Sequence, residues 1–518
     1  MNKIIIELAK NQQYTCKYLE NDKYKYLYSK YIPEKINFEV NINEDTEIIL
    51  LLGLGLGYEL NLIRQKTNKI IYVLENNIEF IKHNKNLPEN VILVYGDEYK
   101  QLVFNKKIQI VINDNLMNIS KNYFKEVLDY IKFKKNMLKI LVVEHPTVML
   151  DCVKSFEKMG FEVDTINLKN LSELIERLNS NHYDYIFTIN FYNSIANICE
   201  KANIKYLSWV VDTPCYSLYI NDLNFNYSYI FIYDKSIVKD LKQKGATNVY
   251  YLPVAVDVDR LDNILKKDVK YSSDVSFLGS CCSHNEYLNH YYPALSNEIK
   301  ELVEKIIEIQ MLSNNYIIKD LVDKNFLDVF TKEGRIKLTN IQFKHLSNED
   351  LLAFYLGRYH SYVERKTIIN NLSSKFDVSL YGEEGWLRED QNGIIKKIYR
   401  GEADHYSEMP EIFRNSKINL NITRSFVESG LPMRVFDVLG SKGFLVTNDK
   451  EDIHRLFKPG RDLVIYRDLK DLDEIINYYL NHETERLEIA QSGYETTKNE
   501  HSFEHRINKM FDTIKKLD

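Results

Sequence analysis

The residues best suited to chemistry gather in the last third of the chain, around two arginines and one aspartate. Arg424 follows the apolar run 417–422, and Arg434 and Asp437 follow Gly430 in the segment Gly-Leu-Pro-Met-Arg-Val-Phe-Asp. Arginine binds a diphosphate through paired hydrogen bonds, and a helix amino terminus adds a favourable dipole. A nucleoside diphosphate that leaves a sugar gains negative charge, which such groups stabilise. We therefore predict a nucleotide-sugar site, with Arg424 and Arg434 on the diphosphate and Asp437 on the ribose or the donor sugar.

This prediction requires a helix that begins at Leu431, beside Pro432 and directly after Gly430. Arg434 and Asp437 are three residues apart, so they would share one face of that helix. The alternative is an exposed Arg–Asp pair, which contributes only about 0.2–0.5 kcal/mol to a helix. Small residues after other predicted strands could bring backbone N–H groups to the diphosphate. These residues are Gly279, Ser280 and Gly382.

Two polar residues in the middle third could serve the acceptor. Asp212 precedes a Thr-Pro turn after the apolar run 205–210, and it could orient or deprotonate an acceptor hydroxyl. The alternative is a turn aspartate that caps the next backbone N–H. His145 follows the run 138–143 and would face the same cleft, although a lone histidine is more often structural. We predict Asp212 and His145, with Arg434, as the catalytic group.

A second nucleotide site is predicted near the amino terminus. Gly53, Gly55 and Gly57 lie between an apolar run and a helical pattern, and Glu75 and Asp97 follow the next two runs. Glycines there let backbone N–H groups approach a ligand, and an acidic residue at the end of the next strand commonly holds ribose hydroxyls. The glycine segment, Glu75 and Asp97 together resemble an S-adenosylmethionine site. The alternative is tight strand-to-helix packing in a degenerate domain, since the chain before the next apolar run is too short for a methyltransferase sheet.

Short apolar runs that alternate with helical patterns must position these side chains. The alternation occurs three times, which is typical of βαβ units and parallel sheets. It predicts an α/β protein with three Rossmann-like domains, residues 1–136, 137–262 and 263–518. Helical periodicity between about 285 and 375 predicts a helical insertion in the third domain. Ligand contacts gather at the carboxyl ends of parallel strands, so the loops that follow the strands should carry the sites.

The carboxyl-terminal part of the chain resembles the CgeB-like glycosyltransferases, which belong to the group-one enzymes. The matching segments are 417–424, 430–439, 443–448 and 457–463, and residues 209–214 and 253–260 are similar to the acceptor-side and hinge segments. The resemblance implies a two-domain B-type fold formed by the last two domains. It implies a nucleotide sugar in the carboxyl-terminal domain, an acceptor in the cleft, and transfer without a metal and with retention.

The sequence departs from the usual group-one motif of two glutamates seven residues apart. Asp437 occupies the second place, and either Glu428 or Ser429 occupies the first. The aspartates Asp257 and Asp259 lie in the predicted hinge, and we do not interpret them as a metal-binding pair. Segment 28–35, together with the glycines 53–57, resembles the amino-terminal region of motility-accessory-factor-type proteins, which are associated with flagellin glycosylation. That resemblance implies a bacterial protein whose acceptor is a protein hydroxyl, on flagellin or another surface protein.

The composition excludes several classes of protein. The chain has 518 residues, 68 Lys and Arg, 74 Asp and Glu, and a net charge of −6, whereas a nucleic-acid binder needs a basic domain or stripe. No apolar run approaches the roughly 20 residues of a membrane helix, and the first residues carry no secretory signal. Six cysteines without a CxxC motif indicate a reduced compartment and no structural metal.

We therefore expect a cytoplasmic glycosyltransferase. Its partners would be a nucleotide sugar and a protein or glycan acceptor, with no cofactor, metal, nucleic acid or integral membrane segment. Two alternatives stay open. One is an S-adenosylmethionine-dependent methyltransferase that works through the amino-terminal domain, and the other is a non-catalytic sugar-binding scaffold.

Overall fold

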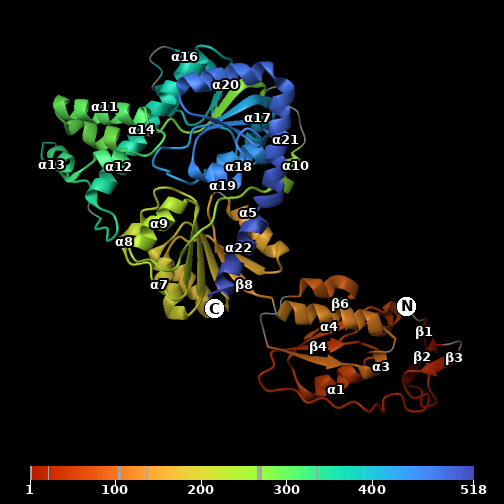
Figure 1. Cartoon of the computed structure of the whole chain (residues 1–518). Coiled ribbons are helices and arrows are strands. Elements are labelled where there is room, and N and C mark those ends of the chain that lie inside the picture. Colours follow the sequence, from red (N-terminus) through yellow and green to blue (C-terminus); the bar gives the residue numbers. More distant parts are fainter. Residues whose placement is uncertain are drawn as a thin grey trace. The chain divides into compact units, whose positions relative to one another are not determined.

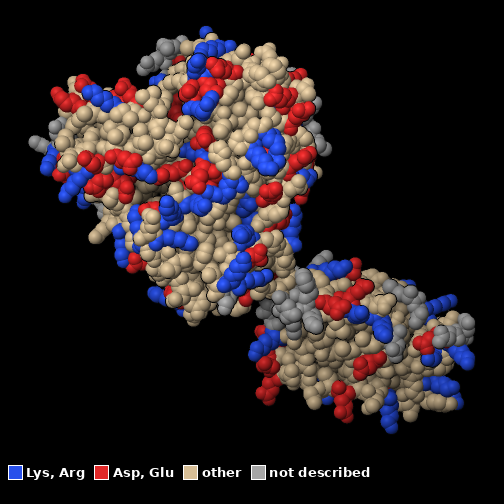
Figure 2. All heavy atoms as spheres, in the orientation of Figure 1, with Lys and Arg blue, Asp and Glu red and all other residues tan. Residues whose placement is uncertain are grey.

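The computed structural model describes residues 3–20, 23–102, 107–117, 119–135, 137–146, 148–264, 271–333, 336–339, 341–388, 390 and 393–517. The chain divides into two compact units, Met1–Met137 and Leu138–Asp518 (Figure 1). Among the described residues, three of the four sheets are parallel, which confirms the predicted α/β class. No helix of the described residues is both long and apolar enough to cross a membrane. On the face shown in Figure 2, basic and acidic side chains are interspersed.

The first unit contains a parallel sheet and a small antiparallel sheet. The parallel sheet has the order β6-β5-β4-β7 and consists of β4 (Ile48–Leu52), β5 (Ile70–Glu75), β6 (Val91–Tyr95) and β7 (Ile108–Ile112). Every residue of β4 is buried because helices cover both faces of the sheet. These helices are α1 (Tyr58–Lys66), α2 (Ile78–His83), η1 (Gly96–Gln101), α3 (Asp114–Met117) and α4 (Lys121–Lys135). The antiparallel strands are β1 (Ile4–Leu8), β2 (Tyr14–Glu20) and β3 (Lys23–Tyr26).

The second unit begins with a six-stranded parallel sheet in the order β13-β12-β11-β10-β8-β9. Its strands are β8 (Lys139–Val143), β9 (Glu162–Ile166), β10 (Tyr185–Ile189), β11 (Lys205–Val210), β12 (Ser228–Ile232) and β13 (Val249–Tyr251). The helices of this part are α5 (Met149–Lys158), α6 (Leu171–Ser180), α7 (Asn193–Ala202), α8 (Ser217–Ile220), α9 (Lys235–Gln243) and α10 (Val258–Asn263).

A five-stranded parallel sheet in the order β15-β14-β16-β17-β18 follows in the same unit. Its strands are β14 (Ser273–Leu278), β15 (Val378–Tyr381), β16 (Ser416–Asn421), β17 (Leu445–Asn448) and β18 (Val464–Tyr466). The segment between β14 and β15 is helical, and α11, α12 and α13 pack on the long helix α14 (Figure 1). It comprises η3 (Tyr287–Tyr291), η4 (Tyr292–Ala294), α11 (Asn297–Met311), α12 (Ile318–Leu321), α13 (Lys324–Glu333) and α14 (Asn348–Ser373).

The remaining helices surround the five-stranded sheet, except for α22, the last helix of the chain. They are α15 (Gly385–Arg388), α16 (Ile394–Ile398), α17 (Met409–Asn415), α18 (Met433–Gly440), α19 (Glu451–Leu456), α20 (Leu469–Asn481), α21 (Glu483–Glu500) and α22 (Phe503–Lys515). Helix α22 returns to the six-stranded sheet and packs on α5 (Figure 1). Phe511 stacks on Phe161 there, with ring centroids 4.9 Å apart. One apolar cluster contains residues of both sheets of this unit, and a second cluster belongs to the five-stranded sheet alone.

Candidate functional site

The central feature is the pair of loops that leave the neighbouring strands β14 and β16. The strands are parallel partners, so residues 279–282 and residues 423–432 emerge at the same edge of the sheet. Arg424 lies on the second loop, and Arg434 is the second residue of α18. A Cβ atom on Gly279 would lie 3.3 Å from Nη2 of Arg434. The structure thus brings Gly279 and Arg434 together.

A third arginine, which the sequence analysis missed, joins these loops. Arg365 projects from α14 and is only 5% exposed. One of its Nη atoms donates to the carbonyl oxygen of Ser280 at 2.8 Å, and the other donates to the carbonyl oxygen of Ile422 at 3.0 Å. Arg365 therefore ties the loop after β14 to the end of β16. We call Arg365, Arg424 and Arg434 the arginine cluster.

The arginine cluster concentrates positive charge. Burial lowers the pKa of Arg434 to about 10, and the charges of Arg365 and Arg424 act in the same direction. None of the three arginines forms an ion pair with a carboxylate of the described residues, and Nε of Arg434 has no hydrogen-bond partner there. The charges of Arg365 and Arg424 also lower the pKa of the Cys282 thiol, although burial alone would raise it. Among the residues that the structure describes, no carboxylate therefore forms a direct ion pair with the cluster, although Asp437 acts on Arg434 from a distance.

Asp437 lies one turn beyond Arg434 on α18 and is 9% exposed. Burial raises the pKa of this carboxyl to about 6, while the nearby charges of His405, Arg260 and Arg434 oppose the rise. Arg260 also faces Asp151, with Nε 3.5 Å from Oδ1. Asp437 is therefore within electrostatic range of Arg434, but it is also surrounded by groups of α5, α10 and the loop before α17.

The predicted start of the helix at Leu431 is wrong. Helix α18 begins at Met433, with Pro432 as its N-cap and Leu431 buried in the core. A proline disfavours the helical conformation of the residue before it, so Leu431 stays outside the helix. A Cβ atom on Gly430 would lie 2.8 Å from Cε2 of Tyr233. Gly430 thus permits close contact with the turn after β12.

Two smaller groups support the loop after β14. Gly382 accommodates the carbonyl oxygen of Gly279, which a Cβ atom there would approach to 2.3 Å. The indole N–H of Trp386 donates to the same oxygen at 2.9 Å. The hydroxyl of Ser280 lies 3.2 Å from the thiol of Cys282. Gly382 is therefore a packing contact beneath the loop, while Ser280 is part of it.

The acceptor-side residues also lie near each other. Burial lowers the pKa of His145, and the charge of Asp212 opposes this, which places the two side chains within electrostatic range. Asp212 is exposed, and its carboxylate accepts a hydrogen bond of 2.7 Å from Asn190. Burial raises the pKa of the Tyr233 hydroxyl, and the charges of Asp212 and Arg424 both act on this group. Tyr233 is thus within electrostatic range of one acceptor-side residue, Asp212, and of one member of the arginine cluster, Arg424.

The glycine loop of the first unit is filled by its own side chains. The carboxylate of Glu75 is 1% exposed and accepts backbone N–H groups, including that of Leu54 at 3.0 Å. A Cβ atom on Gly53 would lie 2.5 Å from Leu116, and one on Gly55 would lie 2.2 Å from the hydroxyl of Tyr28. A Cβ on Gly57 would meet Asn84, and Asp97 pairs on the surface with Lys100. These contacts explain the glycines through packing.

One family model and several solved structures are similar to parts of this chain. Residues 365–512 match the family model described as glycosyl transferase-like. No curated protein matches the chain. Solved structures that resemble it include a glycosyltransferase from Rickettsia africae, at 10% identity over 74% of this chain and 99% of that one (TM-score 0.44). Another is Anabaena HepE in complex with UDP-glucose, at 9% identity over 73% and 100% (TM-score 0.42). The family match begins at Arg365 and spans the whole arginine cluster.

Proposed function

We propose that the protein is a glycosyltransferase that moves a sugar from a nucleotide-sugar donor to an acceptor hydroxyl. The observation that carries this proposal is the arginine cluster. Arg365 is buried, Arg424 and Arg434 are half-buried, and no described carboxylate pairs with any of the three. Charged groups withdrawn from water are unfavourable unless they are paired. A diphosphate supplies the missing negative charge and matches the bidentate geometry of guanidinium groups. The glycosyl transferase-like match over the same residues supports the assignment of this diphosphate to a nucleotide sugar.

In this proposal each group has one task. Arg424 and Arg434 donate to the diphosphate, and Arg365 holds the two loops at the distance that the diphosphate requires. Gly279 and Ser280 line its other side. Asp437 accepts hydrogen bonds from the ribose or the donor sugar. The arginines supply the positive charge, so the proposed reaction needs no metal ion.

The transfer step forms one bond and breaks one. The acceptor oxygen bonds to the anomeric carbon, and the bond between that carbon and the diphosphate oxygen breaks. Its electron pair leaves with the nucleoside diphosphate, and the arginine cluster stabilises the charge that develops. The hydroxyl proton passes to Asp212, with His145 beside it. The CgeB-like subgroup, retention of configuration and a flagellin-type acceptor stay predictions.

The test is Arg434→Ala. We expect at least a roughly 100-fold loss of transfer, as for removal of other charge-stabilising donors. Calorimetry with UDP-glucose and a panel of other nucleotide sugars should show weakened donor binding, while the circular dichroism spectrum is unchanged. The matched control is Arg467→Ala, an exposed arginine paired with Asp471 at 3.0 Å in the same unit. Near-normal transfer by Arg434→Ala would remove the assignment.

A further inference from the structure

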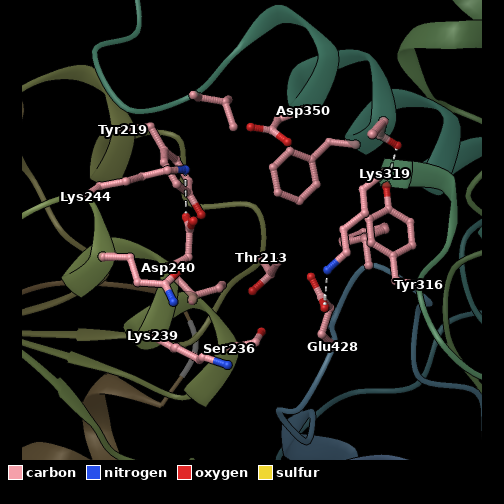
Figure 3. A pocket seen from close by; sticks show the side chains of 16 residues that line it. Thr213, Tyr219, Ser236, Lys239, Asp240, Lys244, Tyr316, Lys319, Asp350 and Glu428 are labelled. Atoms are coloured by element: carbon pink, nitrogen blue, oxygen red, sulfur yellow. Dashed lines mark hydrogen bonds and ion pairs between the residues drawn. The ribbon is translucent and has the colours of Figure 1, made fainter. Parts of the chain in front are cut away.

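A cavity of about 330 Å³ lies beside the proposed transfer centre. Figure 3 shows its walls: side chains of α9 point into it from one side, and side chains of α12 and α14 from the other. The loop after β16 closes a further side with Phe426 and Glu428, and Thr213 contributes from the turn after β11. None of the predicted donor-binding residues lines the cavity, so the diphosphate site does not account for it.

The cavity adjoins both halves of the proposed reaction. Phe426 and Glu428 follow Arg424 on the same short loop, so one side of that loop faces the cavity and Arg424 belongs to the arginine cluster. Thr213 follows Asp212, the proposed base. The Tyr233 hydroxyl is within electrostatic range of both Asp212 and Arg424. Thr213 and Phe426 therefore bring a molecule in the cavity close to both the proposed base and the donor site.

The charges that line the cavity are largely paired with one another. Lys319 contacts Glu428 at 2.6 Å, and Lys244 contacts Asp240 at 2.9 Å (Figure 3). Lys239 is exposed. Paired side chains still offer hydrogen-bond donors and acceptors, but their opposite charges largely cancel. They therefore do not select a phosphate or another strongly charged group. They match a neutral molecule that carries many hydroxyls.

Aromatic rings form much of the rest of the wall. Tyr219, Tyr316, Phe354 and Phe426 all line the cavity. The hydroxyl of Tyr316 donates to the carbonyl oxygen of Ala353 at 2.6 Å, which fixes the orientation of its ring. Flat apolar faces beside polar groups suit a ring that has C–H faces and a hydroxylated rim. A sugar ring has this chemistry.

We infer that this cavity binds one sugar unit of the acceptor, so the hydroxyl that receives the transferred sugar belongs to a carbohydrate, whether free or attached to a protein. The inference rests on the proposed function and names the acceptor class for it. A volume of 330 Å³ lies at the small end of ligand pockets and suits one ring rather than an extended peptide. The acceptor hydroxyl loses its proton to Asp212 and bonds to the anomeric carbon, and the nucleoside diphosphate leaves with the electron pair of the broken bond.

The experiment uses the full chain and two readouts. The first is slow release of nucleoside diphosphate from a nucleotide sugar without acceptor, which reports the donor site. The second is transfer to a panel of oligosaccharides and methyl glycosides, and to unglycosylated serine and threonine peptides. Phe354→Ala removes one aromatic wall, and Asp240→Asn removes a charge on α9 that is 44% exposed and carries little risk to folding.

We expect both variants to keep donor hydrolysis and to raise KM for the carbohydrate acceptor about tenfold or more. The matched controls are Phe326→Ala and Asp328→Asn, both on α13 and outside the cavity. Asp328 pairs with Lys332 one turn along its helix, as Asp240 does with Lys244. Both controls should leave KM unchanged. Normal KM values in both cavity variants, or transfer to the peptides but not to the sugars, would overturn the inference. Absence of any donor hydrolysis or binding by the wild type would instead overturn the proposed function.

Discussion

A buried guanidinium group cannot lose its proton at physiological pH, so it keeps the unfavourable free energy of a charge removed from water. Even with its pKa lowered to about 10, Arg434 stays charged near pH 7, and Arg365 and Arg424 lie near it. Three like charges at one sheet edge repel each other unless an anion joins them. Arg365 donates hydrogen bonds to two carbonyl oxygens, which stabilise its charge but do not neutralise it. A diphosphate would therefore relieve an unfavourable arrangement as well as gain contacts.

Asp437→Asn tests the electrostatics of the same helix. Burial raises the pKa of Asp437 from 3.8 to about 6, so the folded state holds this proton more tightly than the unfolded state. Stability is therefore lost as the pH rises from about 4 to about 6. A shift of about two units corresponds to about 3 kcal/mol. We expect the variant to unfold at a higher urea concentration than the wild type above about pH 6, and the difference to vanish towards pH 4.

Donor affinity should fall in the same variant, because an amide accepts ribose hydroxyls less well than a carboxylate. The control is Asp377→Asn, an exposed aspartate in the same unit, which should change neither quantity. A pH-independent difference between Asp437→Asn and the wild type would contradict the raised pKa.

The loop between β16 and α18 contributes to the donor site, to the cavity and to the contact with the turn after β12. It carries Arg424 to the arginine cluster, presents Phe426 and Glu428 to the cavity, and holds the turn after β12. Lys450 donates to the carbonyl oxygen of Ser425 at 3.3 Å. The hydroxyl of Ser429 donates to Asp234 at 2.7 Å. A displacement of this loop should therefore disturb donor and acceptor together.

Gly430→Ala displaces the loop by steric conflict. The added Cβ would lie 2.8 Å from Cε2 of Tyr233 and 3.1 Å from Cα of Asp234. Overpacking of this kind destabilises a core by about 1–3 kcal/mol. We expect a lower thermal midpoint and a raised KM for both substrates. Ser429→Ala is the matched comparison, because it removes a hydrogen bond without adding volume. A midpoint equal to that of the wild type would mean that Tyr233 moves aside freely.

At the scale of the whole molecule, each unit has its own apolar core. The first unit buries residues such as Leu50 and Phe124, and the second buries a separate and larger set that includes Phe187 and Phe436. Units with separate cores can unfold in separate transitions. The glycine loop and the arginine cluster belong to different units, so their ligands can be distinguished thermodynamically.

Differential scanning calorimetry with ligands makes that distinction. A nucleotide sugar at about 100 times its Kd should stabilise the second unit by about 2.7 kcal/mol and raise one transition only. S-adenosylmethionine should move neither transition, because Tyr28, Leu116 and Glu75 already fill the glycine loop. A rise of the transition of the first unit with S-adenosylmethionine would favour the methyltransferase alternative.

The sequence by itself predicted buried parallel strands and the helix that carries Arg434 and Asp437. The apolar run 48–52 predicted the buried strand β4, and the segment 430–437 located Arg434 and Asp437 on one helix. Such patterns depend on neighbours within a strand or one helical turn, which is the range over which periodicity carries information. The periodic pattern misplaces the first residue of α18, because Pro432 disfavours the helical conformation of Leu431 and the helix begins at Met433.

The tertiary structure alone decided which distant residues meet. Arg365 lies within a 26-residue helix and looks like an ordinary helical arginine, yet it binds carbonyl oxygens 85 and 57 positions away. Gly430 looked like a helix opener, yet its neighbour is Tyr233 in the turn after β12. The cavity takes its walls from α9, α14 and the loop after β16. Contacts of this kind depend on how whole elements pack, and no local pattern of residues records that packing.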